Sequence, residues 1–254
     1  MADTQMNESK RGNFTSNIGF VLATAGSAVG LGNLWRFPYM TGTSGGGAFV
    51  LVYLLIMVVV GVSLLLVEFT VGRSGKANAV DSYRKISPKM VWVGYLGFIT
   101  AFIFLSYFSV VGGWTIHYAI SSFTGLFKLA PDEMGGFFGN FIGNPIVPLI
   151  YHFLFMGATV YIIASGVEHG IEKWAKILMP ALFVMMLILV IRSLTLPGAL
   201  AGVGWYLKPD FSKINMSVIV AALGQVFFSL SVGMSGMVTY ASYLKRKDNL
   251  PKTA

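Results

Sequence analysis

The sequence predicts an all-α protein that spans a membrane, because of its composition and the spacing of its apolar residues. The chain has 254 residues, of which 55% are hydrophobic and 11% are charged, and its mean hydropathy is +0.72. The apolar residues gather in long, almost uncharged runs, which are typical of transmembrane helices rather than of a soluble core. The chain has no cysteine, so disulfides and thiolate metal sites are excluded.

Six apolar segments are long enough to cross a bilayer. We expect a single transmembrane domain over 1–254 with helices at about 16–39, 46–72, 91–126, 146–166, 174–196 and 216–244. The third segment is too long for one perpendicular crossing, so we expect it to tilt or to project from the membrane. A glycine-rich turn joins the first two segments, and loops that contain proline join segments 3 to 4 and 5 to 6.

The positions of the basic residues predict the orientation of these helices. With the N-terminus inside, thirteen of the 18 lysines and arginines fall on the cytoplasmic side and five fall on the outer side. The positive-inside rule therefore places both termini in the cytoplasm of a protein in the plasma or inner membrane. The net charge of +8 is explained by this topology, so we expect the lipid bilayer as a partner and no nucleic acid.

The first apolar segment contains a glycine-rich and polar stretch. Residues 26–38 read Gly-Ser-Ala-Val-Gly-Leu-Gly-Asn-Leu-Trp-Arg-Phe-Pro. Gly is costly inside a helix, and Asn and Arg are costly in hydrocarbon. Backbone leaves helical pairing at membrane depth only where it is buried in protein or lines a watery cavity. Freed amides favour an anion and freed carbonyls favour a cation, so the stretch predicts a site for a small charged solute and a cation.

The sixth segment has a similar interruption. Residues 224–236 contain three glycines and three serines near the middle of an otherwise apolar run. Two interrupted helices about five crossings apart indicate a transporter built from inverted repeats, with its site where the two breaks meet.

At these residues the chain resembles the neurotransmitter:sodium symporters. The run 25–38 is similar to the first-helix signature of that family, and further family motifs follow at 45–49, Glu68 with 72–73, 113–114 and 225–231. The resemblance covers 11–247 and implies the first five-helix repeat plus the sixth helix of an inverted-repeat (5+5) fold. It also implies a non-enzymatic, sodium-coupled symporter of amino acids or related small zwitterions that works by alternating access.

The resemblance implies roles for single residues. The Ala28 carbonyl, Asn33 and Ser229 would bind a first sodium ion, and the Gly26 and Val29 carbonyls would bind a second. A substrate carboxylate would lie against the backbone amides of residues 31 and 32 and complete the shell of the first ion. The full set of implied substrate-binding residues is Ala28, Leu31, Gly32, Phe104, Tyr107, Phe108, Phe228, Ser229, Ser231 and Met234.

Further residues are implied in gating and support, namely Arg11, Phe14, Arg36, Glu68, Gln225 and Tyr243. Arg36 resembles an outer-gate arginine, whereas Arg11, Phe14 and Tyr243 resemble the inner gate. The Glu68 carboxyl would hydrogen-bond the unwound backbone. Tyr53, Gln225 and Ser229 match positions linked to chloride, but the deciding residue of the family lies in a seventh helix, so chloride dependence stays open.

Two features depart from the family pattern. The family usually has a tyrosine six residues before the tryptophan of segment 3, where this chain has Phe108 preceded by Tyr107. Either the helix shifts so that Tyr107 serves, or the carboxylate loses a hydrogen bond worth about 1.5–3 kcal/mol. Family members also have about twelve helices. We therefore expect a partial protein that either pairs with a missing C-terminal half or is a non-transporting fragment.

Other interpretations of these residues stay open. Gly26 and Gly30 also form a helix-packing pattern, Glu68 fits a side chain that snorkels near a helix end, and Arg11 fits a topogenic charge. A channel-like membrane binding protein is the main functional alternative. An intramembrane serine protease is not favoured, because no helix with a histidine base follows Ser235. A nucleotide-binding loop is not favoured either, because the Gly30-Leu31-Gly32 run lacks its remaining motif residues.

Overall fold

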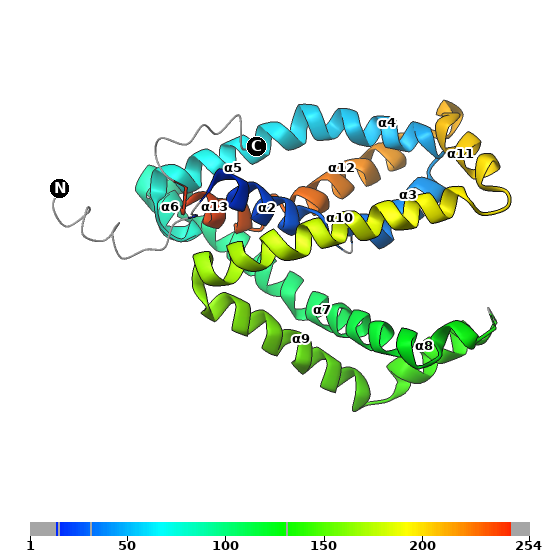
Figure 1. Ribbon diagram of the computed structural model, residues 1–254. Coiled ribbons are helices and arrows are strands. Elements are labelled where there is room, and N and C mark those ends of the chain that lie inside the picture. Colours follow the sequence, from blue (N-terminus) through cyan, green and yellow to red (C-terminus); the bar gives the residue numbers. More distant parts are fainter. Residues whose placement is uncertain (1–13, 15, 31, 131, 245–254) are drawn as a thin grey trace.

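The computed structural model describes residues 14, 16–30, 32–130 and 132–244, and this part of the chain is helical with no β-strand. Figure 1 shows the pair α7 (Val91–Thr124) and α9 (Val147–Ala164) diverging from the other long helices toward one end. The fold class therefore matches the all-α expectation.

The first expected helix consists of two helical pieces with a bend between them. α2 (Asn17–Ala28) ends before Val29, which is extended with φ −90° and ψ 91°. The π-helical turn η1 (Gly32–Arg36) then leads into α3 (Phe37–Thr43). The two pieces meet at an angle of 52°. Glycines on both sides of the bend make this interruption inexpensive, since they add little to helix stability.

The second and third segments are long apolar helices. α4 (Gly47–Ile56), the π-helical turn η2 (Met57–Gly61) and α5 (Val62–Gly75) form one helical run. A short helix, α6 (Ala79–Ile86), and the 3₁₀ turn η3 (Pro88–Met90) connect this run to α7. The Asn78 side chain caps α6 by accepting a hydrogen bond from the Asp81 N–H.

The connections that follow α7, α9 and α10 are also partly helical. The 3₁₀ turn η4 (Leu126–Lys128) and the helix α8 (Glu133–Gly143) lie between α7 and α9. The π-helical turn η5 (Val167–Glu172) begins the run of α10 (Lys173–Leu194). α11 (Ala199–Leu207) and the 3₁₀ turn η6 (Phe211–Lys213) follow. Three additional α-helices therefore lie between the expected segments: α6 between the second and third, α8 between the third and fourth, and α11 between the fifth and sixth.

The sixth expected helix is also divided. α12 (Met216–Leu230) and α13 (Gly236–Ala241) are separated by five residues. Three of these have positive φ: Ser231 at 52°, Gly233 at 83° and Ser235 at 61°. Left-handed backbone is uncommon for residues other than glycine and costs energy, so this break needs support from its surroundings.

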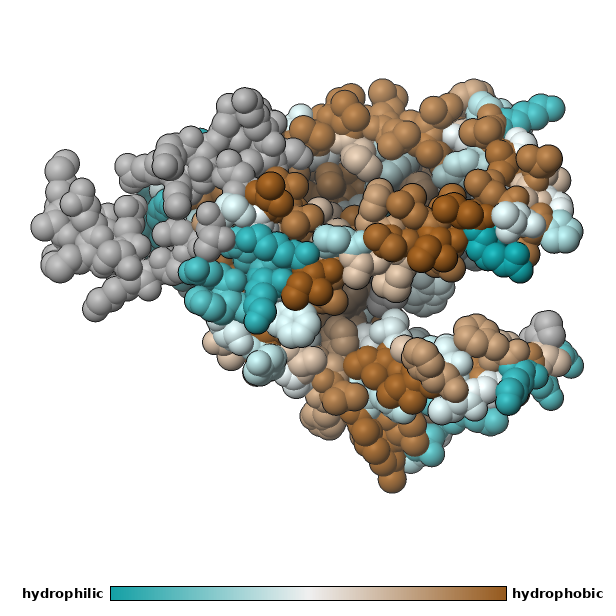
Figure 2. Space-filling model, viewed as in Figure 1, coloured by the Kyte–Doolittle hydropathy of each residue, from teal (hydrophilic) through white to brown (hydrophobic). Residues whose placement is uncertain are grey.

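Four helical runs in the described part of the chain are long and apolar enough to cross a membrane, at 47–75, 88–124, 147–164 and 167–194. The bent pair of 18–28 and 32–43 makes a fifth if it counts as one span. α12 has 15 residues, so the expected sixth crossing requires α12 and α13 together. Figure 2 shows hydrophobic residues over much of the visible surface of α4, α9 and α10, which suits contact with lipid.

Each half of the second break packs on a different part of the run α4–α5. Ala222 and Val226 of α12 pack on Phe49 and Tyr53 of α4. On α5, a Cβ atom added at Gly72 would lie 2.9 Å from the Ala241 Cβ of α13. The absence of a side chain at residue 72 therefore allows α5 and α13 to approach closely, and this contact holds the second break in place.

Candidate functional site

The two helix breaks lie against each other. The Ser229 hydroxyl of α12 donates a hydrogen bond to the Asn33 side-chain oxygen at 2.5 Å. The Ser231 hydroxyl donates to the Ser27 carbonyl at 3.4 Å. Residues separated by about 200 positions in the sequence are therefore in contact where both helices are interrupted.

The three oxygen donors implied for the first sodium ion meet at this contact. The Asn33 side-chain amide donates to the Ala28 carbonyl at 2.6 Å, and its oxygen accepts from Ser229, which is only 4% exposed. Peptide, amide and hydroxyl oxygens are the ligands that hard cations prefer. These neutral oxygens therefore suit a hard cation. Among the described residues, no group of three or more His, Cys, Asp or Glu is placed to hold a metal ion.

The carbonyls implied for the second ion lie at the C-terminal end of α2. The Val29 N–H closes the last turn of α2 on the Ala25 carbonyl at 2.7 Å. No N–H among the described residues donates to the Gly26 carbonyl. Carbonyls at a helix C-terminus carry partial negative charge, which favours a cation. In the described residues no hydrogen bond joins these two carbonyls to α12 or α13.

Gln225 connects the outer half of the first broken helix to α12. Its side chain is fully buried at 0% exposure. The amide donates to the Gly32 carbonyl at 3.2 Å and to the Ser229 hydroxyl at 3.3 Å. Its oxygen accepts from the Arg36 guanidinium at 3.1 Å. Because buried hydrogen bonds of this kind fix side-chain positions, Gln225 orients both Ser229 and Arg36.

A cavity of about 660 Å³ lies beside this contact. Its lining is mainly aromatic and consists of Gly32, Trp35, Arg36, Tyr39, Met40, Tyr107, Phe108, Val111 and Phe228. The Arg36 guanidinium lies 5.7 Å from the centre of the Phe228 ring, within the range of a cation–π contact. One cationic side chain in an otherwise apolar cavity favours a ligand that has both an anionic group and an apolar part.

Phe104 supports the aromatic lining without belonging to it. Its ring packs edge-on against Phe228 at 5.6 Å and stacks on Phe108 at 4.8 Å. Tyr107 and Phe108 both line the cavity, and α7 runs through this region as an uninterrupted α-helix. No shift of register therefore brings Tyr107 into the place of Phe108, and the two residues line the cavity from neighbouring positions of α7.

Glu68 supports the second break. Its side chain is 7% exposed, and one carboxyl oxygen accepts a hydrogen bond from the Gly233 N–H at 2.7 Å. The other oxygen is buried and has no partner among the described residues. Burial, and after it the charge of the Glu68 carboxylate, raises the pKa of the Tyr83 phenol on α6.

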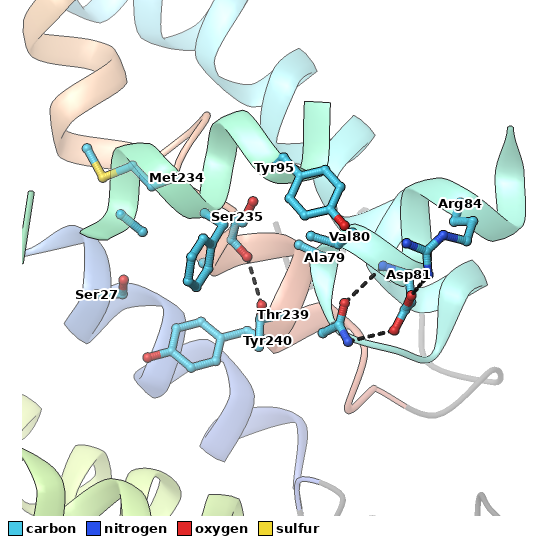
Figure 3. Close-up of a pocket in the computed structure, with 14 residues that line it drawn as sticks. Ser27, Ala79, Val80, Asp81, Arg84, Tyr95, Met234, Ser235, Thr239 and Tyr240 are labelled. Atoms are coloured by element: carbon cyan, nitrogen blue, oxygen red, sulfur yellow. Dashed lines mark hydrogen bonds and ion pairs between the residues drawn. The ribbon is translucent and has the colours of Figure 1, made fainter. Parts of the chain in front are cut away.

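Several expected site residues lie elsewhere. Met234 lines a different cavity of about 740 Å³, together with Ser27, Tyr95 and Tyr240 (Figure 3). Phe14 packs against Phe20 and Tyr240 at 5.4 and 6.4 Å, in a cluster that Tyr243 also contacts. Tyr53 packs against Phe37 at 4.8 Å. Leu31 and Arg11 lie outside the described residues.

The sequence interpretation did not include four residues that line the 660 Å³ cavity. These residues are Trp35, Tyr39, Met40 and Val111. A signal was present, since Tyr39 and Met40 follow Trp35 and Arg36 by four positions and Val111 follows Tyr107 by four. Side chains four residues apart share one face of a helix.

Comparisons with known proteins show what this chain is similar to. A model of the sodium:neurotransmitter symporter family matches residues 11–131 and 140–254. The uncharacterized sodium-dependent transporter YhdH of Bacillus subtilis is 44% identical over 98% of this chain and 56% of that protein. The human sodium- and chloride-dependent GABA transporter 2 is 28% identical over 94% of this chain and 46% of that protein.

A solved structure extends the comparison to three dimensions. The crystal structure of MhsT in complex with L-phenylalanine matches with a TM-score of 0.88 and 45% identity, over 96% of this chain and 56% of that one. The chain thus spans about half the length of the relatives it matches. Its apolar helices and these relatives indicate a multi-pass membrane protein, and the chain belongs to the sodium:neurotransmitter symporter family.

Proposed function

We propose that this chain forms the solute-binding part of a sodium-coupled symporter that carries an amino acid by alternating access. The observation that carries this proposal is the meeting of Ala28, Asn33 and Ser229 where two interrupted helices touch. Broken helices at membrane depth lose backbone hydrogen bonds, which costs stability. A membrane anchor or an enzyme scaffold would therefore have no need for two broken helices in contact. The helices would form one transmembrane domain in the plasma or inner membrane, with both termini cytoplasmic.

The site also accounts for coupling between solute and ion. Asn33 and Leu34 N–H groups both donate to the Gly30 carbonyl, whereas no described residue accepts from the Gly32 N–H. A solute carboxylate placed at residue 32 would lie next to Asn33 and would itself become a ligand of the first ion. Binding of either species then increases the affinity for the other, which is the thermodynamic requirement for coupled transport.

The cavity suggests the class of amino acid. Its aromatic and apolar lining suits a large apolar side chain, and the relative MhsT was crystallised with L-phenylalanine. Among the residues of the lining, Arg36 would pair with the carboxylate of such a solute. The chain covers about half of its relatives, so we propose coupled transport for the whole protein, in which this chain supplies both helix breaks.

The test is the sodium dependence of amino-acid binding. Radiolabelled L-phenylalanine is titrated into membranes that contain the protein, in sodium or in potassium buffer. We expect binding in sodium only, and Asn33→Ala should raise the sodium concentration needed by about tenfold or more, because it removes an ion ligand. Asn140→Ala, on the exposed part of α8, is the matched control and should bind normally. If the Asn33→Ala variant binds with unchanged sodium dependence, Asn33 is not a ligand of the first sodium ion.

Uptake separates the proposal from the channel-like alternative. A symporter accumulates L-phenylalanine in vesicles against its gradient when sodium is supplied outside. A channel-like protein passes ionic current without such accumulation. Accumulation driven by sodium supports the proposal, and current alone supports the alternative.

A further inference from the structure

A short apolar helix at one end of the molecule is largely exposed. α11 has nine residues, none of them charged and none of them buried. At about 1.5 Å per residue it is too short to cross a hydrocarbon core of about 30 Å. Leu200 and Leu207 are 84% and 72% exposed, and Trp205 and Tyr206 are residue types that gather where lipid chains meet headgroups. α11 therefore fits this boundary of the membrane.

A cavity of about 330 Å³ lies where α11 ends. Its lining comes from the glycine-rich turn before α4, the end of α11 and the residues that follow, and it consists of Gly45, Trp205, Lys208, Pro209, Asp210 and Lys213. A Cβ atom added at Gly45 would lie 3.2 Å from the Lys213 Cβ, and one added at Gly46 would lie 3.2 Å from the Trp205 ring. Both glycines have positive φ, at 95° and 61°, so side chains there would be strained and would crowd the cavity.

The cavity has more positive than negative charge. Lys208 and Lys213 contribute two ammonium groups, whereas Asp210 contributes one carboxylate. That carboxylate accepts hydrogen bonds from the Ser212 hydroxyl at 2.5 Å and the Ser212 N–H at 3.1 Å, and the hydroxyl bond above all lowers the pKa of Asp210. In the part of the chain that the structure describes, no carboxylate lies within ion-pair distance of either lysine. Both ammonium groups are therefore available to an anion.

The surroundings of the cavity indicate which anion this is. Phe211 and Met216, which lie on either side of Lys213 in the sequence, are 59% and 72% exposed. Figure 2 shows hydrophilic residues beside hydrophobic ones at this end of the molecule. A free anion gains nothing from exposed apolar side chains. A phospholipid offers its phosphate to the lysines, which bind phosphate as point charges, and its acyl chains to the apolar side chains.

We propose that this cavity binds the phosphate of an anionic phospholipid and that α11 lies against the acyl chains of the same lipid. The site shares no lining residue with the 660 Å³ cavity beside the helix breaks, so the proposal does not depend on the solute or on sodium. Because the turn at Gly46 packs against Trp205, the bound lipid also holds the connection between α3 and α4.

The test is native mass spectrometry of the purified protein, which counts the phospholipids that stay bound in detergent. Phosphatidylglycerol, which is anionic, is titrated in parallel with zwitterionic phosphatidylcholine that has the same acyl chains, and inorganic phosphate is added as a competitor. The variants are Lys208→Gln, Lys213→Gln and the double variant. Lys128→Gln is the matched control, since Lys128 is an exposed lysine in a different connection, η4. Lys213→Arg keeps the positive charge.

We expect one tightly bound phosphatidylglycerol, and at least tenfold weaker binding of phosphatidylcholine. Each single Lys208→Gln or Lys213→Gln change should weaken phosphatidylglycerol binding about fivefold and the double variant about 25-fold, because each lysine attracts the phosphate separately. Lys128→Gln and Lys213→Arg should bind it as the native chain does.

Three results would overturn the proposal. The first is native affinity of the double variant for phosphatidylglycerol. The second is an equal loss in Lys128→Gln or equal binding of phosphatidylcholine, since either shows that these two lysines form no specific site for an anionic headgroup. The third is displacement of phosphatidylglycerol by an equal concentration of inorganic phosphate, because the cavity then prefers a free anion to a lipid.

Discussion

The Glu68 carboxyl offers a sharp test of how the second helix break is held. Replacing Glu68 with Ala removes the acceptor of the Gly233 N–H, which lies at 2.7 Å. A hydrogen bond to a charged group contributes about 1.5–3 kcal/mol to stability. Part of this is offset, because the second carboxyl oxygen is buried without a partner among the described residues. We therefore expect Glu68→Ala to lower the free energy of unfolding by about 2 kcal/mol.

Glu68→Gln separates charge from shape. The amide keeps one acceptor oxygen for Gly233 but loses the negative charge, so its loss should be smaller, about 1 kcal/mol. Unfolding is followed by circular dichroism as SDS is added to mixed micelles. Deuterium uptake of peptides that cover 231–235 reports the break itself and should rise in Glu68→Ala. The reasoning is refuted if Glu68→Ala is as stable as the native chain, or if the uptake of this region does not change.

Two further predictions concern packing and solute recognition. Gly72→Ala should lower the free energy of unfolding by about 1–3 kcal/mol, since its Cβ would lie 2.9 Å from the Ala241 Cβ. Gly224→Ala is the control, because nothing lies within 4 Å of its added Cβ, and equal losses in SDS unfolding would contradict the close packing of α5 on α13. Phe108→Tyr should tighten L-phenylalanine binding about tenfold, if the new hydroxyl reaches the carboxylate. A titration that shows unchanged or weaker binding would place the carboxylate elsewhere.

The sequence alone predicted the helix breaks well, for a physical reason. Glycines beside Asn33 and Arg36 are too costly for a plain apolar helix, so the position of the first interruption follows from composition. The same holds for the second break, where Gly233 lies among serines. The all-α class and the family were also predicted, and both are confirmed.

The connections and the cavities were harder to predict. α8 and α11 lie in segments that contain glycine and proline, which favour turns, and packing overrides such local preferences. Met234 was expected to shape the substrate pocket, but it follows left-handed backbone at Ser231 and lines the other cavity. The direction of a side chain at a non-helical residue depends on φ and ψ, which composition does not specify.

The hydrogen-bond partners of Gln225 could not be predicted from the sequence either. Its position in a motif suggested a supporting role, yet its bonds to Gly32, Ser229 and Arg36 depend on how α12 crosses the first break. Long-range hydrogen bonds of this kind are fixed by tertiary packing. The assignments of ions and solute to these residues stay predictions.

The most direct test of the account is an experimental structure of the protein in saturating sodium and L-phenylalanine. The account predicts non-helical backbone at 29–31 and 231–235 in this structure. It also predicts an ion bound by the Ala28 carbonyl, the Asn33 side chain and Ser229, with the solute carboxylate as a further ligand. Continuous helices through both regions, or an ion that contacts none of these three residues, would contradict it.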